Sequence, residues 1–188
     1  MNIFQRFFGR SRKQSERDRR TDANVDMGLR ELRPGALLDY DLHTWEVTAV
    51  YHYEWENHFT TKEYKLESGQ DVVFLHLEED DELLCSVARK LSLAALDPQL
   101  QAYIEQHDEP YRELTYQGRT YYRKEENLGY LSQEGRSGRS RLVSWDYEDS
   151  SEDHFINVER WGETDFEAAA GVYADHYEFS NFLPPSDE

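Results

Sequence analysis

The sequence predicts a mainly β protein, in which two similar antiparallel β-meander halves pack into one sheet-rich sandwich or barrel-like domain with one short connecting helix and a basic N-terminal tail. One observation is an internal repeat. YKLESGQDVVFLHLE at residues 64–78 and WDYEDSSEDHFINVE at residues 145–159 share aromatic, glutamate and apolar positions without a gap, so that Phe74 corresponds to Phe155. Another is the supply of large rings, 13 Tyr, 9 Phe and 4 Trp, which favours strands. We expect the halves to close around a shared, ring-filled interior with no room for a reaction centre.

The predicted domain covers residues 29–185 and follows a tail and linker over residues 1–28. Its half-repeats lie at about 35–90 and 110–180. The clearest strand begins at Trp45, where apolar and polar residues alternate with a period of two. This alternation predicts one core face, made of Trp45, Val47, Ala49, Tyr51, Tyr53 and Trp55.

Turn signals divide the remaining sequence into further elements. The sequence predicts a helix capped by Asp97, with Pro98 at its first position and its end before Pro110. A hairpin is expected at Gln117-Gly118, and residues 132–141 are expected to form a mobile basic loop because they lack an apolar anchor. Strands are predicted at 59–67, 72–78, 83–88, 142–148, 154–160, 164–170 and 172–179.

The charge is distributed unevenly around a net value of −18. Residues 1–20 hold seven basic and two acidic residues, whereas residues 21–188 hold fourteen basic and thirty-seven acidic ones. A body this acidic repels polyanions, so we expect no nucleic acid binding there. A polycation is a possible partner of the acidic body, and a role of the charge in solubility alone is the competing interpretation.

The N-terminal tail combines apolar residues at helical spacing with a basic run. Such a tip can enter a lipid interface while its cations meet anionic headgroups. Docking on a protein partner and the absence of any role are the alternatives. The expected contact residues are Ile3, Phe4, Arg6, Phe7, Phe8, Arg10, Arg12 and Lys13.

Constellations with catalytic or metal-binding potential are weak in this sequence. His52, Glu54, Glu56 and His58 alternate along one strand, and residues almost 7 Å apart in a straight row cannot converge on one metal ion. Cys85 and His76 could face each other across a hairpin, but apolar neighbours favour packing over a reactive thiolate. We therefore predict no catalytic residue, metal or cofactor.

Four residues are candidate binding contacts. Trp161 falls at a predicted hairpin tip, where its ring either binds a partner or folds back over the sheet. Arg136, Arg139 and Arg141 belong to the predicted mobile loop and could meet an anion, although a solvated loop is the simpler interpretation.

Short segments spread over the chain resemble the bacterial domain of unknown function family 4178. They are residues 32–35, 45–55, 63–66, 116–122, 158–162 and 178–184, with sequences that include LRPG, EYKL, YQGRTYY, VERWG and EFSNFLP. The resemblance covers about residues 29–185. It implies a β-rich cytoplasmic protein without established activity or assigned functional residues. Because members are often encoded beside membrane-protein and polyamine-synthesis genes, it also implies a membrane-associated or polyamine-linked role.

These observations favour a non-enzymatic binding or adaptor module, held at an anionic membrane surface or a protein partner by its tail. Polyamine or other polycation binding by the acidic body is the alternative, and an uncharacterised enzyme is the third hypothesis. One cysteine and the absence of a secretory segment predict a cytoplasmic location, possibly peripheral at the inner membrane.

Overall fold

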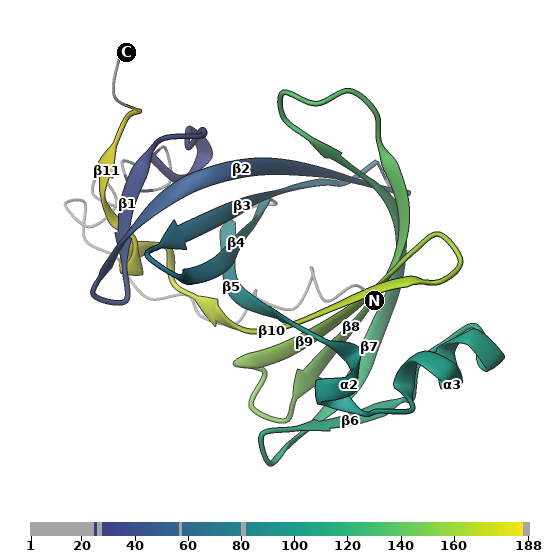
Figure 1. Cartoon of the computed structure of the whole chain (residues 1–188). Helices are drawn as coiled ribbons and strands as arrows, with labels where there is room; N and C mark the ends of the chain where they lie inside the picture. Colours follow the sequence, from purple (N-terminus) through teal and green to yellow (C-terminus); the bar gives the residue numbers. More distant parts are fainter. Residues whose placement is uncertain (1–24, 26–27, 57, 80–81, 186–188) are drawn as a thin grey trace.

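The computed structural model describes residues 25, 28–56, 58–79 and 82–185. Its strands form an antiparallel sheet that closes into an eight-stranded barrel (Figure 1). In the order of the barrel these strands are β2 (His43–Trp55), β3 (Thr60–Ser68), β4 (Asp71–Glu79), β5 (Leu83–Leu91), β10 (Asp165–Ala174), β9 (His154–Trp161), β8 (Ser140–Asp149) and β7 (Arg119–Gln133). Pairing of β2 with β7 completes the ring, which confirms the mainly β, barrel-like prediction.

The barrel consists of two consecutive meanders, as the sequence analysis expects. Strands β2 to β5 form the first and β7 to β10 form the second, and they meet where β5 pairs with β10. The turn at Gln117-Gly118 is also confirmed, and both residues have positive φ angles, 50° and 78°. It joins β6 (Glu113–Tyr116) to β7.

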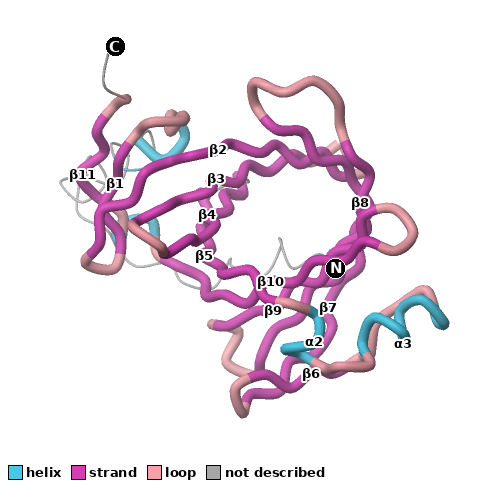
Figure 2. The backbone as a smooth tube through the Cα atoms, in the orientation of Figure 1, coloured by secondary structure: helices cyan, strands magenta, loops and turns pink. Residues whose placement is uncertain are grey.

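Smaller elements lie on the outside of the barrel (Figure 2). β1 (Leu37–Tyr40) pairs with β2 and with β11 (Ser180–Leu183), which follows the short 3-10 helix η2 (His176–Glu178). The predicted connecting helix is present as α3 (Leu100–His107), preceded by the unpredicted α2 (Leu93–Leu96). α3 begins at Leu100 with Gln99 as its N-cap, so the predicted cap at Asp97 and start at Pro98 are wrong. The Asp97 carboxylate instead accepts a hydrogen bond from the Gln99 backbone N–H at 2.7 Å, in the turn between α2 and α3.

The hydrophobic cores lie outside the barrel wall. The prediction of a shared interior filled by rings is therefore only partly right, because Phe74 and Phe155 do point inward but line a cavity instead of filling it. The first core covers the outer face of β3, β4 and β5, where Tyr64, Leu66 and Leu75 are fully buried beneath the chain segment that contains Leu29 and beneath Phe179. The second covers the outer face of β8 and β9 beneath α2, α3 and β6. Because the added elements bury the outer faces, the inner faces are free to carry polar residues.

A β-bulge in β2 explains a second difference from the sequence prediction. The pairing of β2 with β3 shifts register between Val47 and Ala49, so the strand accommodates one extra residue there. Trp45, Val47 and Val50 therefore pack in the first core, while Tyr53 faces the interior. The single core face predicted for residues 45–55 is divided between the two sides of the barrel wall.

The connection between β7 and β8 is shorter than predicted. β7 continues without interruption to Gln133, beyond the predicted start of the loop at residue 132. β8 begins at Ser140, so the connection covers residues 134–139 rather than 132–141. Hydrogen bonds tie it to the barrel, because the Glu134 N–H donates to the Val50 carbonyl at 2.9 Å.

Candidate ligand-binding site

The inner faces of the strands enclose two adjoining chambers, which we together call the lumen. The inner chamber has a volume of about 130 Å³. The outer chamber is larger, about 940 Å³, and more open. Tyr53, Glu63 and Phe74 line both chambers, so the two lie next to each other. A cavity of this size can hold a small molecule.

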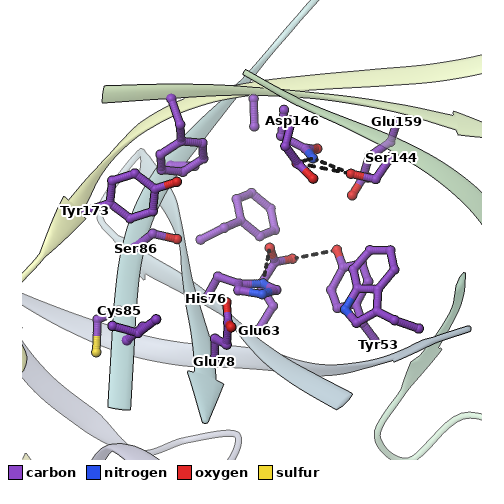
Figure 3. Close-up of a pocket in the computed structure, with 17 residues that line it drawn as sticks. Tyr53, Glu63, His76, Glu78, Cys85, Ser86, Ser144, Asp146, Glu159 and Tyr173 are labelled. Atoms are coloured by element: carbon purple, nitrogen blue, oxygen red, sulfur yellow. Dashed lines mark hydrogen bonds and ion pairs between the residues drawn. The ribbon is translucent and has the colours of Figure 1, made fainter. Parts of the chain in front are cut away.

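Glu63 projects from β3 into the lumen beside two residues of neighbouring strands (Figure 3). The Tyr53 hydroxyl donates a hydrogen bond to Glu63 Oε1 at 3.4 Å. His76 Nδ1 lies 3.8 Å from the other carboxylate oxygen. Burial raises the pKa of the Tyr53 phenol, and the negative charges of Glu159 and Glu63 raise it further. Tyr53 therefore remains a neutral donor that orients the carboxylate.

Asp146 projects from β8 on the opposite wall and is held by three side chains. Asn157 Nδ2 donates to Asp146 Oδ1 at 2.7 Å, and Asn127 Nδ2 donates to Oδ2 at 3.0 Å. The Ser144 hydroxyl donates to Oδ1 at 3.2 Å. Burial raises the pKa of Asp146, while these three hydrogen bonds act in the opposite direction. The network fixes the carboxylate in one orientation.

Glu159 projects from β9 into the inner chamber, which Glu63 and Asp146 also line. From the residues that the structure describes, its carboxylate receives no hydrogen bond and no ion pair within 4.0 Å. Burial raises the pKa of Glu159 to about 8, with Glu63, Glu167 and Asp146 adding to the increase and Lys90 opposing it. Glu159 is therefore largely protonated at neutral pH, and a cation beside it would favour its charged form.

Aromatic rings form much of the remaining wall. Tyr53 and Trp55 stack with their centroids 5.3 Å apart, and Phe155 lies 5.3 Å from Tyr173. The Tyr173 hydroxyl donates to Glu148 at 3.0 Å. Ring faces carry partial negative charge and attract cations. Carboxylates and rings in the lumen thus favour the same kind of guest.

The lumen combines features of a binding site with features of an acid-base site. A carboxyl group with a strongly raised pKa in a cavity can donate or accept a proton near neutral pH. Within residues 28–56, 58–79 and 82–185, no three His, Cys, Asp or Glu residues are placed to hold a metal ion. The described helices include none long and apolar enough to span a membrane.

Of the four residues predicted as binding contacts, two border the lumen. Trp161 is the last residue of β9 and lines the outer chamber, with Arg141 of β8 at the same rim. The Trp161 indole Nε1 is buried without a hydrogen-bond partner among the described residues. Arg139 instead lies 3.2 Å from Glu54 and 4.2 Å from the Tyr130 ring, so it is not part of a freely solvated loop. Arg136 is exposed.

The other predicted constellations are placed apart from the lumen or outside the description. The tail residues 3–13 lie outside the described residues. His76 lines the lumen and pairs with Ser86, whereas Cys85 is a buried member of the first core that also borders the inner chamber. The suggested opposition of Cys85 and His76 is wrong, because adjacent register positions put the two side chains on opposite faces. The preferred interpretation of Cys85 as a packing residue is confirmed.

The sequence analysis missed the residues that form the lumen. Carboxylates are numerous in this chain, so no pair among 39 acidic residues stands out by spacing. A signal was present in β8 and β9, where Ser144, Asp146, Asn157 and Glu159 alternate with apolar residues. Such alternation alone predicts a solvent-facing side. Only closure of the barrel turns that side into a cavity wall.

Comparisons with known proteins support a family assignment without a function. An uncharacterized protein of Aquifex aeolicus (strain VF5) is 24% identical to this chain over 178 residues, which cover 90% of this chain and 92% of that protein. No solved structure matches the chain. The family model described as "Domain of unknown function (DUF4178)" matches residues 33–176, which include all eight barrel strands, and the chain belongs to this family.

Proposed function

We propose that the protein is a non-enzymatic binding module that holds a small organic cation, an amine with one or more ammonium groups, in the lumen of its barrel. The convergence of Glu63, Asp146 and Glu159 with aromatic walls on one cavity is the observation that carries the proposal. Charge-assisted hydrogen bonds from an ammonium group to carboxylates are about twice as strong as neutral ones. Cation-π contact adds roughly 0.5–2 kcal/mol when the cation is desolvated.

The electrostatics of the lumen also favour a cationic ligand. Burial and the negative charges of neighbouring carboxylates in the lumen both raise the pKa of Glu159. An ammonium group placed among them would remove this repulsion and allow Glu159 to ionise. An anionic guest would increase the repulsion, so phosphates and nucleotides are disfavoured, in agreement with the acidic body.

The first test is calorimetric titration of the full chain with spermidine and putrescine at physiological salt. We expect saturable binding that weakens at least tenfold in Glu63→Gln, because one carboxylate in a cavity contributes more than about 1.4 kcal/mol to an ammonium contact. Glu113→Gln is the matched control, since Glu113 is exposed on β6 and lies outside the lumen. Choline provides an arm for quaternary ammonium ligands.

Two results would contradict this proposal. Affinity that disappears at physiological salt, or that falls equally in both glutamate variants, would indicate attraction to the net charge instead of a site. If mass spectrometry of the same mixtures detects a chemical change of the amine, the enzyme hypothesis is favoured, in which Glu159 acts as an acid or base.

We further propose that the tail attaches this module weakly to the cytoplasmic face of the membrane. The support is the excess of five positive charges in residues 1–20 together with their apolar residues. The intact chain should sediment with anionic vesicles at low salt and remain in solution after truncation of residues 1–20. Equal sedimentation of both proteins would reject the attachment, and co-sedimentation only with a protein partner would favour the docking alternative.

A further inference from the structure

Lys90 places an ammonium group of the protein itself inside the lumen. Lys90 lies on β5 and lines the outer chamber. Ala88, two residues earlier on the same face of the strand, lines the inner chamber. Its Nζ forms an ion pair with Glu167 of β10 and lies 4.9 Å from the centroid of the Phe74 ring. These are the two kinds of contact that an amine ligand would make there.

The surrounding charges hold this ammonium group in its protonated state. Burial alone would lower the pKa of Lys90, but the hydrogen bond that Lys90 donates to Glu167 and the negative charges of Glu167, Glu63 and Glu159 raise it above its ordinary value. Lys90 is therefore positively charged over the whole physiological range. The same charge opposes the increase in the pKa of Glu159, which indicates that Lys90 partly neutralises the carboxylates a ligand would meet.

The ion pair is also easy to break. The side chains of Lys90 and Glu167 are 49% and 41% exposed, and pairs with this exposure contribute little to stability. Lysine carries its charge on a flexible four-carbon stem, so the ammonium group can swing toward the wide outer chamber without moving the strand. A ligand that replaces Lys90 in its contacts with Glu167 and Phe74 therefore loses little free energy by breaking this ion pair.

We propose that Lys90 is a tethered cation that occupies an ammonium position of the lumen in the free protein, and that an amine ligand must displace it. This inference rests on the proposed amine-binding function. Lys90 thereby determines specificity, because it sets how many positive charges the carboxylates Glu63, Glu159 and Glu167 accept from a ligand. It also raises the ligand concentration at which the lumen fills.

The test compares Lys90→Met with the wild-type full chain by calorimetric titration with spermidine. Methionine keeps the apolar stem beside Phe74 and removes the ammonium group. We expect about five- to tenfold tighter binding of spermidine in Lys90→Met, with a smaller gain for propylammonium, which carries one charge. Arg89→Gln is the matched control, because Arg89 is the preceding residue, faces outward and pairs with the exposed Asp71, so that both variants change the net charge equally.

A second arm separates this inference from the proposed function. Lys90→Ala removes the stem and ammonium group, and propylammonium can replace both. Propylammonium should raise the melting temperature of Lys90→Ala by more than that of wild type or Arg89→Gln. That result would support the ammonium position even if wild type bound no amine, in which case only the proposed function would fail. If wild type binds spermidine, equal or weaker binding by Lys90→Met would overturn the inference. No response of Lys90→Ala to propylammonium would overturn it in either case.

Discussion

Replacement of Gly171 by alanine should destabilise the protein by about 3 kcal/mol or more, the largest effect expected from a single methyl group in this chain. Gly171 lies on β10 between β5 and β9. A Cβ atom at this position would lie 2.3 Å from the Val87 carbonyl oxygen and 2.7 Å from Phe155 Cζ. The carbonyl belongs to the backbone of β5 and can move only if the pairing of β5 with β10 is disturbed.

The effect should be large because that pairing joins the two meanders. Strands β2 to β5 and β7 to β10 each form by local hairpins, whereas β5 and β10 are distant in the sequence and meet only when the barrel closes. Urea denaturation of Gly171→Ala should show the lost stability, and thermal unfolding should shift by roughly 6–12 °C. Ala169→Ser, on the same inward face of β10, is the control with room for the added atom. Wild-type stability of Gly171→Ala would contradict the close approach of the strands.

The order of the strands could be predicted from the sequence because it depends on local signals. Turn residues such as Gln117-Gly118 and alternating apolar residues identify hairpins, and consecutive hairpins make a meander. The bulge near Thr48 was not predicted. Its only sign in the sequence is Val50, an apolar residue at a polar position of the alternation, and a strand without a bulge can also carry such a residue. Propensity likewise placed one helix from Asp97 but did not detect α2, which has only four residues.

The direction in which each face points could not be predicted in the same way. The sequence shows that Trp145, Tyr147 and Ile156 share the apolar face of their strands, and all three are fully buried. It does not show whether that face turns toward the barrel axis or toward covering elements. Because α3 and β6 cover the outside, the apolar face turns outward and Asp146 turns inward. Phe74 and Phe155 point inward, as the repeat suggested, but closely packed rings such as Trp145 lie on the outer side of the wall.

The same inversion explains why the binding site is made of residues that a sequence alone would assign to solvent. An acidic residue on the polar face of a strand is usually exposed. In a chain with a net charge of −18, each carboxylate is therefore most simply interpreted as part of a solvated acidic surface. In the closed barrel, Glu63 and Glu159 belong to different halves and still line one cavity. Distances between halves are set by the β2 to β7 and β5 to β10 pairings, for which no short-range signal exists.

Replacement of Glu159 by glutamine should stabilise the protein at pH 9 and leave its stability nearly unchanged at pH 5. The pKa of Glu159 is about 8 in the folded chain and about 4.5 when unfolded. Between these values the folded state binds a proton that the unfolded state lacks, so stability falls as pH rises from about 5 to 8 and the loss is complete above pH 8. Glutamine resembles the protonated acid at every pH and avoids this loss.

We expect the gain at pH 9 to be on the order of 2 kcal/mol, below the full linkage value because Glu159 is only partly buried and solvent reaches the lumen. Thermal unfolding of Glu159→Gln and wild type should therefore coincide at pH 5 and differ by about 4–8 °C at pH 9. Glu113→Gln is the control, because Glu113 is exposed on β6. Parallel stability curves for Glu159→Gln and wild type from pH 5 to 9 would show that the lumen does not repel this charge.

The variant also connects stability with function. If Glu159 is retained to bind an ammonium group, the stable Glu159→Gln variant should bind spermidine more weakly than wild type, most of all above pH 8, where wild-type Glu159 is charged. Binding by the wild type should correspondingly strengthen from pH 6 to 9 and release a proton from Glu159. Buffers of different ionisation enthalpy would measure that proton in the calorimetric titration. Stabilisation together with unchanged spermidine affinity would leave Glu159 as a strained carboxyl group without a part in the binding.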